Sequence, residues 1–206
     1  TADPAITEDL VTLFNYMTGR SRQREYNKLL IAPTTMKSTF IELIDRAIML
    51  STPERPGRIV CKMNQLEDRE VTDALYRASR AGVKVDCYVR GFCCLRAGVP
   101  GLSENIRIFS IIGRFLEHSR IFWFSGGQED PLDGDFFIGS ADWMYRNLHN
   151  RVEAAVPVEN RSLRARLWEI LQICMDDHRQ AWQMRSDGTY ALRDSSHLDP
   201  DDPSMD

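Results

Sequence analysis

The sequence predicts an α/β fold in which a mixed β-sheet is flanked by helices. Apolar runs at residues 28–32, 58–63 and 83–89 alternate with two patterns of helical spacing, which is typical of parallel strands joined by right-handed crossovers. After residue 89 several strand-like runs follow with no helix between them, so part of the sheet must be antiparallel. With 206 residues and 43% hydrophobic content, the chain is long enough to form a buried core.

Each helix of the first half is predicted from the spacing of its apolar residues and from the residues at its ends. Residues 6–18 form the first helix. The second begins at Thr34 or Thr35, whose hydroxyl can cap it, and the third covers 67–81 and ends at Gly82. The inner face of the second helix is predicted to consist of Met36, Phe40, Leu43, Ile44 and Ala47.

The second half of the chain contributes further strands, one long helix and a hairpin. The strands are predicted at 106–111, 119–124, 135–139 and 151–156. A helix from about Asn160 to His178 is expected to bury Leu163, Leu167, Ile170, Leu171 and Cys174. The last segment, 181–192, has Asp187-Gly188 at its centre and is predicted to form the hairpin.

Composition divides the chain into three parts. Residues 1–27 hold the first helix and a short basic linker, 28–186 form the main domain, and 187–206 form an acidic, loosely attached tail. The tail contains six Asp and one Arg, so it accounts for the net charge of −4, and the rest of the chain is close to neutral. A neutral body can still bind an anion where its arginines converge.

Cysteine usage and hydropathy point to a cytoplasmic protein. The five cysteines form no Cys-x-x-Cys pair and have no histidine at zinc spacing, and no metal site is expected in this chain. No basic, apolar signal sequence opens it, and no run of 18 apolar residues is present. Because free thiols persist in a reducing compartment, the cytoplasm is the expected location.

Arginines gather in predicted loops around one histidine. Guanidinium groups stay charged and match phosphate oxygens in a two-pronged geometry, and His118, at the start of a predicted strand, can exchange protons near neutral pH. Each arginine alone is also explained as a solvated surface residue, and His118 as a structural histidine, but the cluster favours a phosphate-bearing ligand. Its members are Arg90, Arg96, Arg107, Arg114, His118, Arg120 and Arg146.

Several common site types are excluded. The sequence has neither Gly-x-x-x-x-Gly-Lys-Ser/Thr nor a Gly-x-Gly-x-x-Gly that opens a helix, so neither common nucleotide cradle is present. It also lacks the Gly-x-Ser-x-Gly elbow of many hydrolases. A bound nucleotide would therefore be held by side chains and irregular loops.

Long runs of this sequence closely resemble the C-terminal part of bacterial polyphosphate kinase, the enzyme that builds inorganic polyphosphate from ATP. The resemblance extends in order over roughly residues 5 to 185. The matching runs are Ser21–Tyr26, Leu29–Pro33, Lys62–Leu66, Tyr88–Gly91, Gly98–Arg107, Gly113–Arg120 and Gly139–Asn147.

The resemblance implies roles for individual residues. The histidine of the family's Leu-Glu-His motif lies in the active site and falls on His118. The arginine of its Val-Arg-Gly motif contacts nucleotide phosphates and falls on Arg90. Arg114, Arg120 and Arg146 are weaker candidates that would line the polyphosphate path or support the site.

The resemblance also implies a fold similar to one half of phospholipase D. His118-Ser-Arg120 and Gly139-Ser-Ala-Asp142 are variants of that enzyme's two signatures. Phospholipase D proper needs Lys and Asp where this chain has Arg120 and Ser125, which disfavours phosphodiester hydrolysis. Asp142 is expected to pair with an arginine, and Trp143 to fill the core.

The implied reaction is reversible transfer of the terminal phosphate of ATP to polyphosphate through a phosphohistidine. That histidine and the Mg²⁺ ligands would belong to the preceding half of the enzyme, of which residues 1–27 would be a remnant, so this chain alone is expected to transfer nothing. ATP, ADP, polyphosphate and the upstream half are the implied partners, and the full-length enzyme a homo-oligomer. Nothing indicates nucleic acid or a transmembrane segment. The alternatives are a phospholipase-D-like phosphodiesterase and a noncatalytic polyphosphate-binding module.

Overall fold

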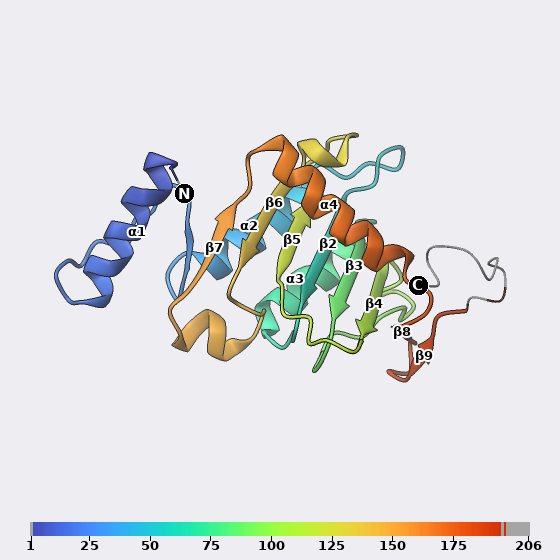
Figure 1. Ribbon diagram of the computed structural model, residues 1–206. Helices are drawn as coiled ribbons and strands as arrows, with labels where there is room; N and C mark the ends of the chain where they lie inside the picture. Colours follow the sequence, from blue (N-terminus) through green and yellow to red (C-terminus); the bar gives the residue numbers. More distant parts are fainter. Residues whose placement is uncertain (1, 195, 197–206) are drawn as a thin grey trace.

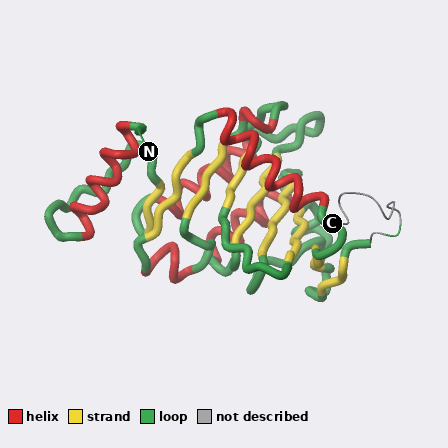
Figure 2. Tube along the Cα trace, viewed as in Figure 1, coloured by secondary structure: helices red, strands yellow, loops and turns green. Residues whose placement is uncertain are grey.

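One mixed β-sheet runs through the computed structural model, which describes residues 2–194 and 196 (Figures 1 and 2). Within these residues the sheet has nine strands in the order β1-β7-β6-β5-β2-β3-β4-β8-β9. Strands β2, β3 and β4 are parallel neighbours, and all other neighbouring pairs are antiparallel. The strands are β1 (Leu30–Ala32), β2 (Arg58–Met63), β3 (Lys84–Val89), β4 (Ile106–Ile111), β5 (Ile121–Phe124), β6 (Asp135–Gly139), β7 (Glu153–Pro157), β8 (Ala181–Met184) and β9 (Tyr190–Leu192). The predicted mixed sheet is confirmed.

Strand β1 departs from a simple alternation of parallel neighbours. It runs in the same direction as β2, but three strands separate the two, and β1 pairs antiparallel with β7 at the edge of the sheet. The helical crossover between β1 and β2 therefore passes behind β7, β6 and β5. A local sequence pattern predicts the direction of a strand, whereas later segments of the chain decide which strand lies beside it.

Helices cover both faces of the sheet (Figure 1). Helices α2 and α3 lie behind the sheet in this view, α4 crosses its front face, and α1 lies beyond the β1 edge. The described residues also include a 3₁₀ turn, η1, and a π-helical turn, η2. The bounds are α1 (Pro4–Met17), α2 (Met36–Met49), α3 (Arg69–Arg80), η1 (Pro131–Asp133), η2 (Arg146–Asn150) and α4 (Arg161–Asp176).

The core between α2, α3 and the sheet contains the predicted inner face of α2. All five residues of that face are buried. Phe40 sits at its centre, with ring centroids 4.7 Å from Phe122 on β5 and 5.4 Å from Trp143. Trp143 is fully buried, as expected from the sequence. These aromatic rings join α2 to the sheet and to the segment that follows β6.

The predicted inner face of α4 is only partly correct. Leu171 is buried, but Leu163 is 58% exposed, and Leu167, Ile170 and Cys174 are half-buried. The reason is that α4 rests on only part of the front face of the sheet, so its apolar stripe is wider than its contact. An apolar side chain on a helix is often left exposed in this way, because polar residues cannot cover a whole protein surface.

The first helix and the last described strand are both joined to the sheet. Helix α1 packs Leu13 against Leu29 and Ile31, and β9 extends the sheet to Leu192, beyond the predicted main domain. The hairpin predicted at 181–192 is confirmed. Residues 195 and 197–206 of the predicted acidic tail lie outside the described residues. No described helix is long and apolar enough to cross a membrane.

We expect Phe40→Ala to lower the free energy of unfolding by about 3–5 kcal/mol, because it removes a fully buried ring and leaves a cavity. Urea denaturation followed by circular dichroism measures this loss. The matched control is Phe14→Ala on α1, where the ring is 60% exposed and the expected change is within about 0.5 kcal/mol. Equal losses in the two variants would contradict the assignment of Phe40 to the core.

Candidate active site

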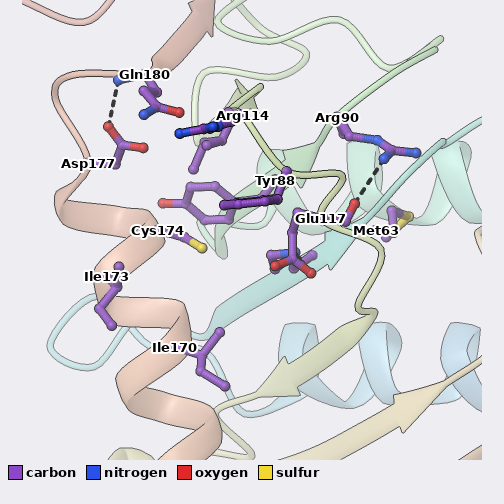
Figure 3. Close-up of a pocket in the computed structure, with 14 residues that line it drawn as sticks. Met63, Tyr88, Arg90, Arg114, Glu117, Ile170, Ile173, Cys174, Asp177 and Gln180 are labelled. Carbon is purple, nitrogen blue, oxygen red and sulfur yellow. Dashed lines mark hydrogen bonds and ion pairs between the residues drawn. The ribbon is translucent and has the colours of Figure 1, made fainter. Parts of the chain in front are cut away.

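The candidate site lies at the C-terminal ends of the parallel strands β2, β3 and β4. A cavity of about 440 Å³ opens there between the strand ends, the loop 112–120 and the C-terminal half of α4. Figure 3 shows its two sides: Arg90 and Glu117 lie on one, and Ile173 and Cys174 of α4 lie on the other, with Tyr88 between them. The α4 side is apolar at Ile170, Ile173 and Cys174, but it also carries the carboxylate of Asp177.

The register of β2 and β3 brings cationic residues to these strand ends. Lys62 pairs with Tyr88 and Met63 with Val89, so both strands end together. Arg90 is the next residue after β3, and its main-chain N–H donates to the carbonyl of Met63 at 3.3 Å. The carbonyl of Arg90 accepts a hydrogen bond from the Ser110 hydroxyl at 2.9 Å. The backbone of Arg90 is thus fixed by both neighbouring strands.

Glu117, in the loop 112–120, contacts two of these cations. Its carbonyl accepts a hydrogen bond from Nη1 of Arg90 at 3.0 Å, and its Oε1 lies 3.1 Å from Nζ of Lys62. The same Oε1 accepts from the hydroxyl and the main-chain N–H of Ser119, at 2.6 and 2.8 Å. Hydrogen bonds from Ser119 and then from Lys62 lower the pKa of Glu117 to about 2, so the carboxylate is ionised at neutral pH.

His118 is held by the arginine two residues further on. Nη1 of Arg120 lies 2.7 Å from Nδ1 of His118 and donates to the His118 carbonyl at 2.9 Å. Because a guanidinium only donates, Nδ1 is the acceptor and the neutral ring carries its hydrogen on Nε2. His118 is exposed, so Nε2 is available to donate to a phosphate oxygen.

Arg120 forms a buried ion pair with Asp142. Its Nε and Nη2 lie 3.1 and 3.2 Å from the two oxygens of Asp142, and both side chains are nearly inaccessible to solvent. Oδ1 of Asp142 also accepts from the main-chain N–H and the side-chain amide of Asn64, at 2.8 and 3.2 Å. The sequence predicted that Asp142 pairs with an arginine, and the structure confirms it.

The structure brings together only part of the arginine cluster. Arg114 is exposed beside Phe115 and lines the same cavity as Arg90. Arg146, also exposed, begins η2, which lies at the same lower edge of the sheet in Figure 1. Arg107 lies at the opposite end of the strands, where it pairs with Asp86 at 2.6 Å, and Arg96 donates to the carbonyl of Ser186. The last two do not belong to the site.

Comparison with known proteins identifies the family. The model of the family "Polyphosphate kinase C-terminal domain 2" matches residues 29–201. The chain belongs to this family. It is 52% identical over 193 residues to the polyphosphate kinase of Synechocystis, covering 94% of this chain and 26% of that protein. It is 47% identical over 190 residues to that of Pseudomonas aeruginosa, covering 92% and 27%. The chain thus spans about a quarter of the length of these polyphosphate kinases.

One solved structure supports the same assignment, and a second shows the fold. The crystal structure of polyphosphate kinase from Porphyromonas gingivalis superimposes with a TM-score of 0.88 at 38% identity, over 95% of this chain and 30% of that one. Nuc from Salmonella typhimurium, a phospholipase D family member, superimposes with a TM-score of 0.56 at 16% identity, over 77% of this chain and 97% of that one. The second match shows that this polyphosphate kinase domain has a phospholipase-D-like fold.

The sequence patterns did not predict three residues that border the candidate site of this polyphosphate kinase domain. Lys62 and Asn64 stand at the end of β2, and Glu117 precedes His118. Polar residues at the end of a strand that is otherwise buried, such as Lys62 and Asn64, are a usable signal. The contact between Glu117 and Lys62 has no such signal, because the two residues are 55 positions apart.

We expect Asp142→Ala to lower the free energy of unfolding by about 3–5 kcal/mol, because it leaves Arg120 buried without its carboxylate. Chemical denaturation measures the loss. Replacing both residues, with Arg120→Met and Asp142→Leu, should recover part of it. The matched control, Glu169→Ala, breaks the exposed pair with Arg166 and should cost about 0–1 kcal/mol. A loss for Asp142→Ala as small as that of the control would argue against a buried pair.

An NMR titration of the Glu117 carboxyl carbon should give a midpoint near pH 2. Because the pKa is lower in the folded chain than the usual 4.5, the ionised carboxylate stabilises the fold at neutral pH, and this contribution is lost as the pH falls from about 4.5 through about 2. Ser119→Ala should raise the midpoint more than Lys62→Met does, since Ser119 is the main cause. A wild-type midpoint at the usual value would refute the contacts of Glu117.

Proposed function

We propose that this chain is the part of a polyphosphate kinase that positions phosphate groups during reversible transfer of the terminal phosphate of ATP to polyphosphate. The observation that carries this proposal is the hydrogen bond from Arg90 to the carbonyl of Glu117. It joins the guanidinium of Arg90 to the residue that directly precedes His118, although Arg90 and His118 lie 28 positions apart in the sequence. Membership in the polyphosphate kinase family supports the choice of reaction.

The chemistry of the site residues fits this role. In the proposed mechanism the bond between the terminal phosphorus and its bridging oxygen in ATP breaks, ADP leaves with the electron pair, and a histidine upstream of this chain takes the phosphoryl group. The group then passes to the end of a polyphosphate chain. Arg90 neutralises phosphate charge and His118 donates from Nε2, while Arg114 and Arg146 line the path of polyphosphate. Such transfers depend mainly on positioning and electrostatic stabilisation.

Mg²⁺ would neutralise phosphate charge when bound, but the residues at this site do not fit a metal. The described residues contain no group of three or more His, Cys, Asp or Glu that could hold a metal ion. The carboxylates that line the cavity are already engaged, Glu117 by Lys62 and Asp177 by the main-chain N–H groups of Arg179 and Gln180. Asp142 is paired with Arg120. We therefore place the Mg²⁺ ligands upstream of this chain. A homo-oligomeric full-length enzyme and a cytoplasmic location stay predictions.

The geometry gives little support to a phospholipase-D-like phosphodiesterase. Arg120 stands where that signature has lysine, and its guanidinium is bound to Asp142. Ser125 stands where it has aspartate and accepts a hydrogen bond from the N–H of Arg58 at 3.0 Å, at the opposite edge of the sheet. A noncatalytic polyphosphate-binding module is distinguished from a kinase by the following test.

The test replaces the matched quarter of the Synechocystis polyphosphate kinase with this chain, and the active chimera serves as the reference. We expect His118→Ala and Arg90→Ala each to lower the rate of polyphosphate synthesis about a hundredfold or more, as does loss of other donors that stabilise a transition state. Arg166→Ala, which removes an exposed arginine of α4, is the control and should leave the rate nearly unchanged.

Near-normal synthesis by both site variants would refute the catalytic role and favour the noncatalytic module. The 206-residue chain alone should take up no label from ATP labelled on its terminal phosphate, because the phosphohistidine is proposed to lie upstream. Stable labelling of the chain would contradict that location.

A further inference from the structure

Lys62 is a buried cation at the end of the central strand β2. Only 8% of the residue is exposed, which is unusual for lysine unless it is paired. Its Nζ lies 3.1 Å from the Ser119 hydroxyl and 3.1 Å from Oε1 of Glu117. The residue also lines the cavity that Arg90 and Arg114 line. A third cation therefore faces the candidate site, and its three N–H donors can turn toward more than one acceptor.

Glu117 presents oxygen atoms to both strand-end cations at once. Its carboxylate is held by Lys62 and its carbonyl by Arg90. A carboxylate accepts hydrogen bonds through charged oxygens, as a phosphate group does. Within the structure, Glu117 thus makes the type of contact with Lys62 that a phosphate oxygen would make.

The loop that carries Glu117 is weakly held. The Glu117 side chain is 56% exposed, and two neighbouring large apolar residues, Phe115 and Leu116, are 83% and 75% exposed. Because more than half of the Glu117 side chain faces solvent, its ion pair with Lys62 is screened and costs less to break than a buried pair would. A polyphosphate segment carries several negative charges, so it can outcompete a single carboxylate for Lys62.

We propose that Lys62 is a further phosphate-binding residue of this site, and that an incoming polyphosphate chain displaces the Glu117 carboxylate from it. This inference rests on the proposed function, because it assumes that phosphate binds at this wall of the cavity. It adds a residue and an exchange step: the ammonium of Lys62 changes partner from Glu117 to phosphate. No covalent bond changes in this step.

A simpler role for Glu117 makes the opposite prediction. If Glu117 only braces the loop and thereby positions His118, removal of its charge weakens phosphate binding. If Glu117 competes with phosphate for Lys62, removal of its charge strengthens binding. Glu117→Gln separates the two roles, because glutamine keeps the size of the side chain and can still accept a hydrogen bond from Ser119.

Isothermal titration of the 206-residue chain with tripolyphosphate at low salt measures the exchange. The chain has its own core on both faces of the sheet, so it is tested by itself. Glu117→Gln should lower the Kd about two- to fivefold, the range expected for loss of a half-exposed ion pair. Lys62→Met should raise the Kd about tenfold or more, because it removes a charged donor. Lys62→Arg, which keeps the charge, should bind tripolyphosphate more tightly than Lys62→Met.

The double variant is the decisive arm. In a Lys62→Met background, Glu117→Gln should have no effect on the Kd, because Glu117 acts through Lys62. The matched control is Glu169→Gln on α4, which changes the net charge equally away from the cavity and should leave the Kd unchanged. Circular dichroism confirms that each variant is folded.

Each result that differs from these expectations refutes a particular part of the inference. A raised or unchanged Kd for Glu117→Gln refutes the exchange. A wild-type Kd for Lys62→Met refutes Lys62 as a phosphate ligand. In both cases a raised Kd for Arg90→Ala leaves the proposed function standing. Wild-type affinity in Arg90→Ala and His118→Ala refutes phosphate binding at this site altogether. Absence of tripolyphosphate binding in every protein, Glu117→Gln included, also refutes the inference.

Discussion

The carboxylate of Asp142 connects the three chain segments from which the candidate site is built. It follows β6, and it accepts hydrogen bonds from Asn64, directly after β2, and from Arg120, directly before β5. A buried carboxylate is costly unless it is fully paired, so the three segments have one favourable arrangement. The same bonds position His118, because Nη1 of Arg120 contacts His118 while Nε and Nη2 bind Asp142.

The partners of the cations decide which of them can attract an anion. Arg120 is neutralised by Asp142, and Lys62 by Glu117. Arg90 is bound only by a carbonyl within the described residues, which satisfies one donor but leaves its charge uncompensated. Arg90 therefore contributes an uncompensated positive charge at the strand ends, and the exposed Arg114 lines the same cavity. Arg120, one of the arginines that the sequence suggested, serves chiefly to position its neighbours.

Much of the fold follows from short-range patterns, whereas the site depends on contacts between distant segments. The spacing of apolar residues predicts that Phe40 is buried, because a helix repeats every 3.6 residues and one face must be covered. The same pattern fails for Leu163, because the extent of the surface beneath α4 is not encoded in α4 itself. The Lys62–Glu117 pair is invisible to any local pattern. The family resemblance locates Arg90 and His118 but does not reveal what holds them.

This chain has arginine at position 120, where the phospholipase D signature has lysine, and the difference has a geometric consequence. A guanidinium can bind both oxygens of Asp142 and still donate to His118, as Arg120 does, whereas the compact ammonium of a lysine cannot span these acceptors. Arginine at this position therefore fixes Asp142 and His118 relative to each other. The site then lacks the mobile ammonium group that a lysine at position 120 would place beside His118. Lys62 on the neighbouring strand β2 provides an ammonium group nearby. Its Nζ lies 3.1 Å from the hydroxyl of Ser119, the residue that separates His118 from Arg120 in the sequence. In the proposed function, the ammonium of Lys62 supplies the charge that the signature lysine of the phospholipase-D-like fold would supply, and its position suits the binding of a long anion better than the hydrolysis of a phosphodiester.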